Sequence, residues 1–104
     1  MDRIETLKSY LSENPSDNFL QHALALEYVK AGDDGKALEL FQRLLQNDET
    51  YVGSYYHLGK LLERLQQEEK AIATYEKGIE MAKQVGDAHA ANELRSALEE
   101  LQDL

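Results

Sequence analysis

The spacing of apolar and small residues limits the fold of this chain more than any other feature of its sequence. Similar residues stand 34 positions apart in the pairs Leu24 and Leu58, Leu38 and Ile72, Phe41 and Tyr75, and Leu45 and Ile79. A fixed interval of this length is typical of a helix-turn-helix unit that stacks on copies of itself. We therefore expect an all-α chain of about six helices, arranged as stacked antiparallel hairpins.

Turn signals divide the chain into segments. Asn14 and Pro15 should end an opening helix, because the residue before a proline is pushed out of helical geometry. Gly32 and Gly86 are each followed by Asp, a pattern that ends one helix and caps the next. We predict one domain with a leading helix, two repeats and a C-terminal capping helix, at residues 1–15, 18–51, 52–85 and 86–104.

The second repeat carries three local predictions. Thr50 is the expected N-cap of its first helix, because a hydroxyl oxygen can accept from the unpaired amides there. Gly59 lies inside that helix at a cost of about 1 kcal/mol in helix propensity relative to Ala, so we expect a neighbouring helix to approach it closely. The turn at residues 66–69 lacks a counterpart of Gly32, and we expect the same bend there with a less favourable backbone.

Composition limits the partners of this chain. Its formal charge of −9 repels phosphate backbones and anionic lipid surfaces, so we expect neither nucleic acid nor a membrane as partner. The absence of cysteine excludes disulfides and thiolate metal sites. Charged residues near the N-terminus argue against a secretory signal, and apolar runs long enough to span a membrane are missing, so we predict a cytoplasmic protein.

Two sets of residues carry a resemblance to a known family. The motif positions are Leu24, Ala25, Tyr28, Gly32, Ala37, Phe41 and Leu44 in the first copy, and Tyr55, Leu58, Gly59, Leu62, Ala71, Tyr75 and Gly78 in the second. With these motifs, residues 18–85 resemble two tandem tetratricopeptide repeats. The first copy departs from the family pattern at Gln21, where a large aromatic residue is usual, and at Leu44, which replaces a small residue.

This resemblance implies a right-handed α-solenoid whose first helices line a concave groove, and a role in holding protein or peptide partners. Some members of the family grip a terminal carboxylate with two basic residues and two asparagines. The corresponding positions here hold His22, Leu26, His57, Asp87 and Ala91. This carboxylate clamp is therefore not expected.

The candidate partner-binding groove consists of two stripes of residues. The α2-to-be stripe on the second helix is Phe19, His22, Leu26 and Val29, and the stripe on the fourth helix is Tyr56, His57, Lys60 and Arg64. The first of these is distinct from the expected core stripe of the second helix, which is Leu20, Leu24, Tyr28 and Ala31. That helix therefore has two apolar faces where a surface helix needs one.

A peptide would use the two stripes differently. Phe19, Leu26 and Val29 would be its apolar anchors, while Tyr56, Lys60 and Arg64 would supply hydrogen bonds or charge. The alternative is that the three apolar residues pack against the first or the last helix of this short array.

Self-association is the alternative function. Ala91, Leu94, Leu98 and Leu101 are spaced like a two-stranded helical seam, and the opening helix lacks the partner helix of its own repeat. Either end would then pair with a second copy in a homodimer. The same seam can instead cover the fourth and fifth helices.

No residue pattern predicts catalysis or metal binding. His22, His57 and His89 lack the i, i+4 spacing that places two ligands on one helical face. Two adjacent first helices could still bring His22 and His57 together, and a zinc titration would test this. The sequence contains neither a phosphate-binding glycine loop nor a nucleophile elbow. We expect no enzyme activity and no cofactor.

Overall fold

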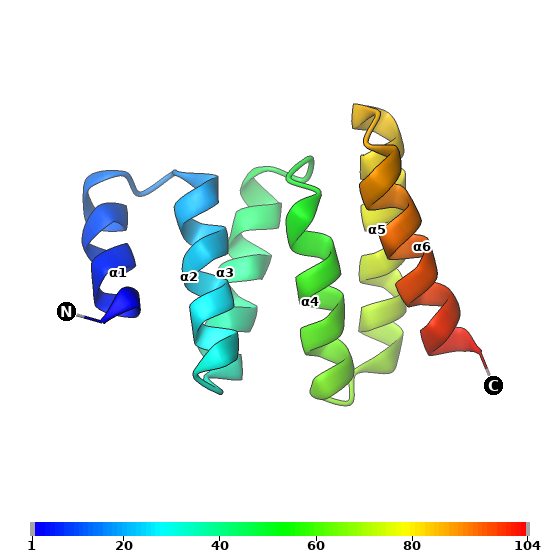
Figure 1. Cartoon of the computed structure of the whole chain (residues 1–104), viewed down its shortest axis with the longest axis horizontal. Helices are drawn as coiled ribbons and strands as arrows, with labels where there is room; N and C mark the ends of the chain where they lie inside the picture. Colours follow the sequence, from blue (N-terminus) through cyan, green and yellow to red (C-terminus); the bar gives the residue numbers. More distant parts are fainter. Residues whose placement is uncertain (1, 104) are drawn as a thin grey trace. The chain divides into compact units, whose positions relative to one another are not determined.

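The computed structural model describes residues 2–103, which form six helices and no strand (Figure 1). The helices are α1 (Arg3–Glu13), α2 (Asn18–Lys30), α3 (Asp34–Asn47), α4 (Gly53–Arg64), α5 (Glu68–Val85) and α6 (Ala88–Gln102). Their contacts divide the chain into two compact units. The first unit ends at Asp48 and contains α1 to α3, and the second unit begins at Glu49 and contains α4 to α6.

In the first unit, α2 packs against both α1 and α3. Phe41 and Leu44 of α3 are fully buried, and Leu24 and Tyr28 of α2 are buried with them. Each helix of this unit begins with an aspartate whose side chain accepts a backbone N–H in the first turn, at Asp2, Asp17 and Asp33. Such caps satisfy amides that have no partner inside the helix.

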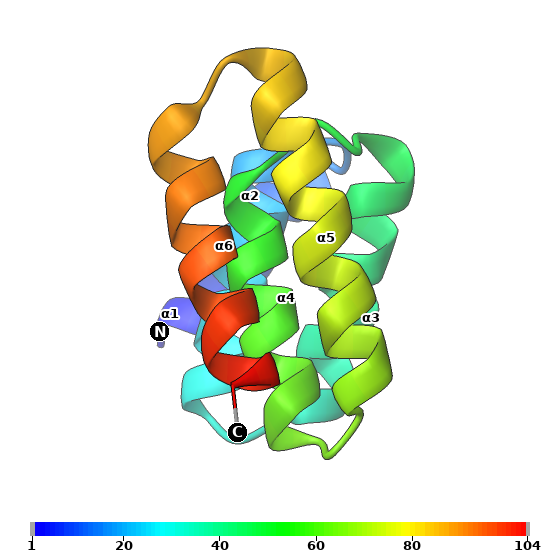
Figure 2. The same cartoon turned by 90° about the vertical axis from the view of Figure 1, so that its right-hand side faces the viewer.

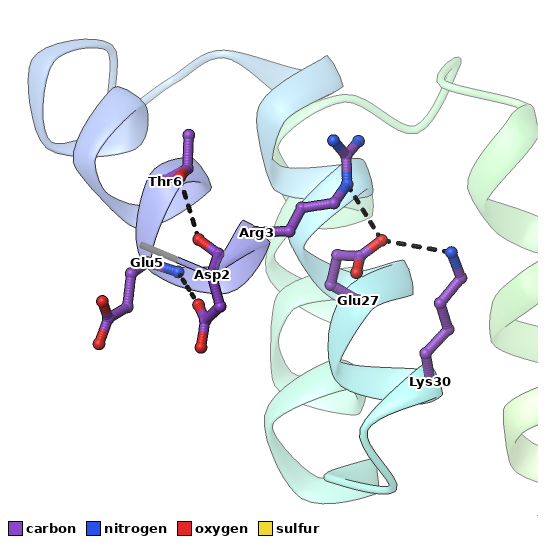
Figure 3. A network of polar contacts seen from close by, with 6 residues as sticks. All are labelled: Asp2, Arg3, Glu5, Thr6, Glu27 and Lys30. Atoms are coloured by element: carbon purple, nitrogen blue, oxygen red, sulfur yellow. Dashed lines mark hydrogen bonds and ion pairs between the residues drawn. The ribbon is translucent and has the colours of Figure 1, made fainter.

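Helix α1 is held to α2 by an ion pair as well as by apolar contacts (Figure 3). Glu27 of α2 accepts from Arg3 Nε at 3.2 Å and pairs with Lys30 Nζ at 3.4 Å. The Glu27 side chain is only 16% exposed, so its carboxylate is less screened than one on an open surface. At the same end of α1, Asp2 accepts from the backbone N–H of Glu5 at 2.8 Å.

In the second unit, α6 packs against both α4 and α5 (Figure 2). Tyr75 and Met81 of α5 and Leu94 of α6 are almost completely buried. The predicted close approach at Gly59 is confirmed, because the ring of Tyr75 lies directly against this glycine. Small residues on one helix thus make room for aromatic rings on the next.

Three helices end in the same left-handed turn. The residues with positive φ are Gly32 at 78°, Gln66 at 64° and Gly86 at 76°. In each turn the N–H of the following residue donates to a carbonyl five positions earlier: Asp33 to Tyr28, Gln67 to Leu62, and Asp87 to Ala82. These bonds define a Schellman motif. The predicted unfavourable backbone in the second repeat is therefore confirmed and lies at Gln66.

Replacing Gln66 by glycine should stabilise the protein. A residue with a Cβ pays about 1–2 kcal/mol in the left-handed region, and glycine returns part of that gain through its more flexible unfolded chain. We expect Gln66→Gly to raise the free energy of unfolding by about 0.5–1 kcal/mol in urea denaturation. Gly32→Ala is the matched control and should lower the same quantity. A loss of stability in Gln66→Gly would contradict this account.

Two local predictions are wrong. Thr50 does not cap α4, which begins at Gly53 with Val52 at the N-cap position and without a side-chain cap. The backbone of residues 51 and 52 caps the helix instead, since Tyr51 O accepts from Ser54 N at 3.2 Å. A hydrogen-bonded backbone turn can replace a capping side chain.

The core face of α2 also differs from the expected one. Ala31 is exposed and Leu20 is only half-buried, whereas Gln21, Ala23 and Ala25 are buried beside Leu24 and Tyr28. The physical reason is that α1 and α3 both pack against α2, so the buried surface extends around more of the helix than one stripe.

Candidate functional site

The α2 stripe, Phe19, His22, Leu26 and Val29, lies at the surface of the first unit. Phe19 is 66% exposed, and the other three residues are half-buried. The His22 ring contacts Phe41 edge-on, with 6.0 Å between the ring centroids. The stripe is thus anchored on the core without being enclosed by it. An exposed phenylalanine beside two half-buried aliphatic residues is the kind of surface that a partner can cover.

The α4 stripe, Tyr56, His57, Lys60 and Arg64, is more polar. Tyr56, His57 and Lys60 are half-buried and Arg64 is exposed. Lys60 Nζ lies 5.6 Å from the centroid of the Tyr56 ring, which in turn contacts the His57 ring edge-on at 5.5 Å. A cation over an aromatic face gains electrostatic attraction and loses side-chain freedom. The stripe therefore offers positive charge on a partly ordered aromatic surface.

Glu63 supports the α4 stripe, and sequence reasoning missed it. Its carboxylate accepts a short hydrogen bond from the Tyr75 hydroxyl and forms an ion pair with Lys60 Nζ at 3.7 Å. Burial raises the pKa of Tyr75 far above its ordinary value, and the hydrogen bond to Glu63 raises this pKa further. The chain thus links the core to Lys60.

The sequence contained a signal for this pair. The residues 34 positions before Glu63 and Tyr75 are Val29 and Phe41. The second repeat therefore gains a carboxylate and a hydroxyl together, where the first repeat has neither.

His57 is the stripe residue with a perturbed acid–base equilibrium. Burial lowers the pKa of His57, and the negative charge of Glu93 on α6 partly opposes this shift. The neutral imidazole is therefore favoured in the folded protein. His89, the other histidine of this unit, is exposed on α6 and pairs with Glu93 at 3.4 Å when it is protonated.

This lowered pKa predicts a loss of stability in acid. The stabilisation that neutral His57 contributes is present above about pH 6.5, the pKa of histidine in an unfolded chain, and is lost as the pH falls through the lowered pKa of the folded protein. We expect His57→Gln to flatten the dependence of unfolding free energy on pH below about 6.5. His89→Gln is the control and should keep the wild-type slope. Equal slopes in His57→Gln and wild type would refute the prediction.

The seam predicted for self-association is largely occupied within the second unit. Ala91 and Leu94 are buried, and Leu98 and Leu101 are half-buried. Because α6 contacts both α4 and α5, these residues cover neighbouring helices of their own chain. This arrangement favours the covering role over the dimer seam.

Neither a metal cluster nor a membrane-spanning helix is found in the described part of the chain. Among residues 2–103, no three His, Asp or Glu side chains are placed so that they could hold a metal ion. Over the same residues, no helix combines the length and the apolar character needed to cross a membrane.

Comparison with protein families and curated proteins gives one consistent answer. A model of the tetratricopeptide repeat matches residues 52–85. A TPR repeat-containing protein of Pseudomonas aeruginosa is 30% identical over 98 residues, which cover 94% of this chain and 93% of that protein.

Solved structures are similar as well. The solution structure of a tetratricopeptide repeat domain protein from Salinibacter ruber aligns with a TM-score of 0.83 and 44% identity, over 86% of this chain and 91% of that one. The solution structure of a protein from Bordetella parapertussis also gives a TM-score of 0.83, with 26% identity over 97% of this chain and 88% of that one. The predicted all-α class built from helical hairpins is confirmed by this likeness.

Proposed function

Because this chain belongs to the tetratricopeptide repeat family, we propose that it binds a protein or peptide partner through the stripes on α2 and α4. Repeats of this family generally mediate protein–protein interaction, and their fold is typically a non-catalytic scaffold. The observation that carries the proposal is the 66% exposure of Phe19 on a helix whose other side is already buried. A surface helix needs one apolar face for its own core, so the second is available to a partner.

The chemistry of the two stripes suggests how each contributes. The α2 stripe offers Phe19, Leu26 and Val29 to apolar side chains, and burial of such anchors usually dominates binding energy. The α4 stripe offers Lys60 and the Tyr56 ring, which suit an acidic or hydrogen-bonding segment. A partner that is apolar at one end and acidic at the other matches both.

Substitutions at the exposed anchor test this proposal. Phe19→Ser should leave the melting temperature almost unchanged, because an exposed side chain contributes little to folding, typically within about 0.5 kcal/mol. Leu26→Glu places a charge in the middle of the same stripe. Both variants should lose the polypeptides that immobilised wild-type protein retains and that mass spectrometry identifies. Gln42→Glu, at an exposed position of α3, is the matched control and should retain them.

Two results would oppose the proposal. Retention of the same polypeptides by Phe19→Ser and Leu26→Glu would show that the α2 stripe is not the contact surface. A large fall in the melting temperature of both variants would instead show that these residues stabilise the fold, as in the packing alternative.

A second copy of this chain is the other partner to test, as a homodimer through the terminal helices. Analytical ultracentrifugation at rising protein concentration measures this directly. A monomer at high concentration would remove the homodimer and leave a partner of different sequence. We place this interaction in the cytoplasm and expect neither cofactor nor catalysis.

A further inference from the structure

The first unit contains a cleft that the proposed binding stripes do not use. Its volume is about 450 Å³, and its lining includes Leu11 of α1, Gln21 of α2, Leu40 and Arg43 of α3, and Pro15 of the turn between α1 and α2. Gln21 is two residues after Phe19, so it projects from a different side of α2 than the stripe. A volume of this size suits a small ligand or a large side chain.

A buried acceptor in the wall of this cleft has no donor. Gln21 is 5% exposed, and its Nε2 donates to the carbonyl of Pro15 at 2.8 Å. Its Oε1 is buried and accepts no hydrogen bond from any residue in the range 2–103. Buried polar atoms are nearly always paired, because the lost hydration is otherwise not replaced. This oxygen therefore points to a missing donor.

The second unit shows what normally stands at this position. Tyr55 is found 34 residues after Gln21, is 4% exposed, and donates from its hydroxyl to the carbonyl of Glu49 at 2.7 Å. Glu49 stands 34 residues after Pro15. The Gln21 amide thus makes the same hydrogen bond as the Tyr55 phenol, but it supplies no ring.

An aromatic residue could not simply be added inside the first unit. The Tyr55 ring packs against Gly78, whose counterpart 34 residues earlier is Leu44. Leu44 is fully buried, so the inner space is already filled. The free volume lies alongside it, where Leu11, Pro15 and Leu40 form an apolar wall.

We propose that this cleft binds the indole of a tryptophan side chain from a partner polypeptide. The ring would contact the apolar wall, and its N–H would donate to Gln21 Oε1. Indole is an N–H donor without an acceptor, which matches a site whose unpaired atom is an acceptor. Arg43 at the cleft is 58% exposed and pairs with Glu39 of its own helix, so a flexible side chain can move aside to admit the ring.

Titration of the whole chain with two model compounds tests this site. N-acetyltryptophanamide has the donor, whereas N-acetylphenylalaninamide has an aromatic ring without one. In two-dimensional NMR we expect the tryptophan compound to shift the Gln21 side-chain amide and the Leu40 signals. It should bind at least about fivefold more tightly than the phenylalanine compound, because only its N–H satisfies the buried oxygen.

Variants separate this site from the stripe. Gln21→Met keeps the length of the side chain and removes the acceptor, so the advantage of the tryptophan compound should disappear. If Gln21→Met does not fold, Ser12→Phe at the exposed rim should block both compounds. Phe19→Ser should leave both affinities unchanged, so failure of the stripe proposal would not mimic failure here. Equal affinities for the two compounds, or no shift at Gln21 up to the solubility limit, would overturn the inference.

Discussion

Replacing Gly59 with alanine should destabilise this protein by about 2 kcal/mol or more, although alanine is the better helix former. A Cβ at position 59 would lie 2.1 Å from Cε1 and 2.5 Å from Cζ of Tyr75. These atoms belong to a fully buried ring, which cannot swing into solvent. The overlap therefore has to be relieved by moving α4 or α5, and the gain of about 1 kcal/mol in helix propensity does not offset that.

The size of the Tyr75 side chain should decide the effect. Urea denaturation of Gly59→Ala measured in wild type and in a Tyr75→Leu background gives the coupling between the two positions. We expect Gly59→Ala to cost clearly less when residue 75 is leucine. Gly35→Ala in α3 is the matched control, since a Cβ there meets no atom within 4 Å. Equal costs in both backgrounds would show that the ring is not the cause.

Removing the Tyr75 hydroxyl should produce the second large effect. Tyr75→Phe leaves the half-buried Glu63 carboxylate without its O–H donor, and hydrogen bonds to charged groups contribute about 1.5–3 kcal/mol. Glu63 retains some contact with water and with Lys60, so we expect a loss of about 1–2 kcal/mol in unfolding free energy. Tyr10→Phe, at an exposed tyrosine, is the control and should be neutral.

The first repeat suggests the compensating change. Phe41 and Val29 stand where the second repeat has Tyr75 and Glu63. Glu63→Val alone buries a hydroxyl without an acceptor, whereas Tyr75→Phe with Glu63→Val reproduces the apolar pair. We expect the double variant to be more stable than the sum of the single changes predicts. Additive losses would show that the two groups do not act as a pair.

The same hydroxyl predicts a dependence on alkaline pH. Because the pKa of Tyr75 is raised in the folded protein, the stabilisation from its neutral form is fully present below about pH 10, the pKa of tyrosine in an unfolded chain. It is lost as the pH rises toward the raised pKa. Tyr75→Phe should therefore be less sensitive than wild type above about pH 10 in thermal unfolding. An unchanged alkaline profile in Tyr75→Phe would contradict the role given to this hydroxyl.

The residues of the candidate site were predictable only in part. Period and helical spacing identified Phe19, Leu26, Tyr56 and Lys60 as one face of each first helix. The exposure of Phe19 and the half-burial of Leu26 depend on how α1 and α3 surround α2. Glu63 was not found because a charged residue on an apparent surface face gives no local sign that a buried hydroxyl will reach it.

The sequence by itself determined the helices, their ends and their family. These features are local or periodic: a glycine or proline ends a helix within a few residues, and a period of 34 residues repeats one hairpin. It also determined that Gly59 meets a large side chain, since a costly glycine inside a helix needs a packing reason. The left-handed turn at Gln66 followed from its place in the repeat.

Only the tertiary structure decided which apolar side chains remain exposed, what caps α4, and which polar groups are paired. The buried surface of α2 extends to Gln21 because two helices cover it, and the orphaned oxygen of that residue exists only because Leu44 fills the space beside it. Such features depend on the volumes of residues far apart in the chain. Close packing makes them sensitive to single side chains in a way that spacing along the sequence does not record.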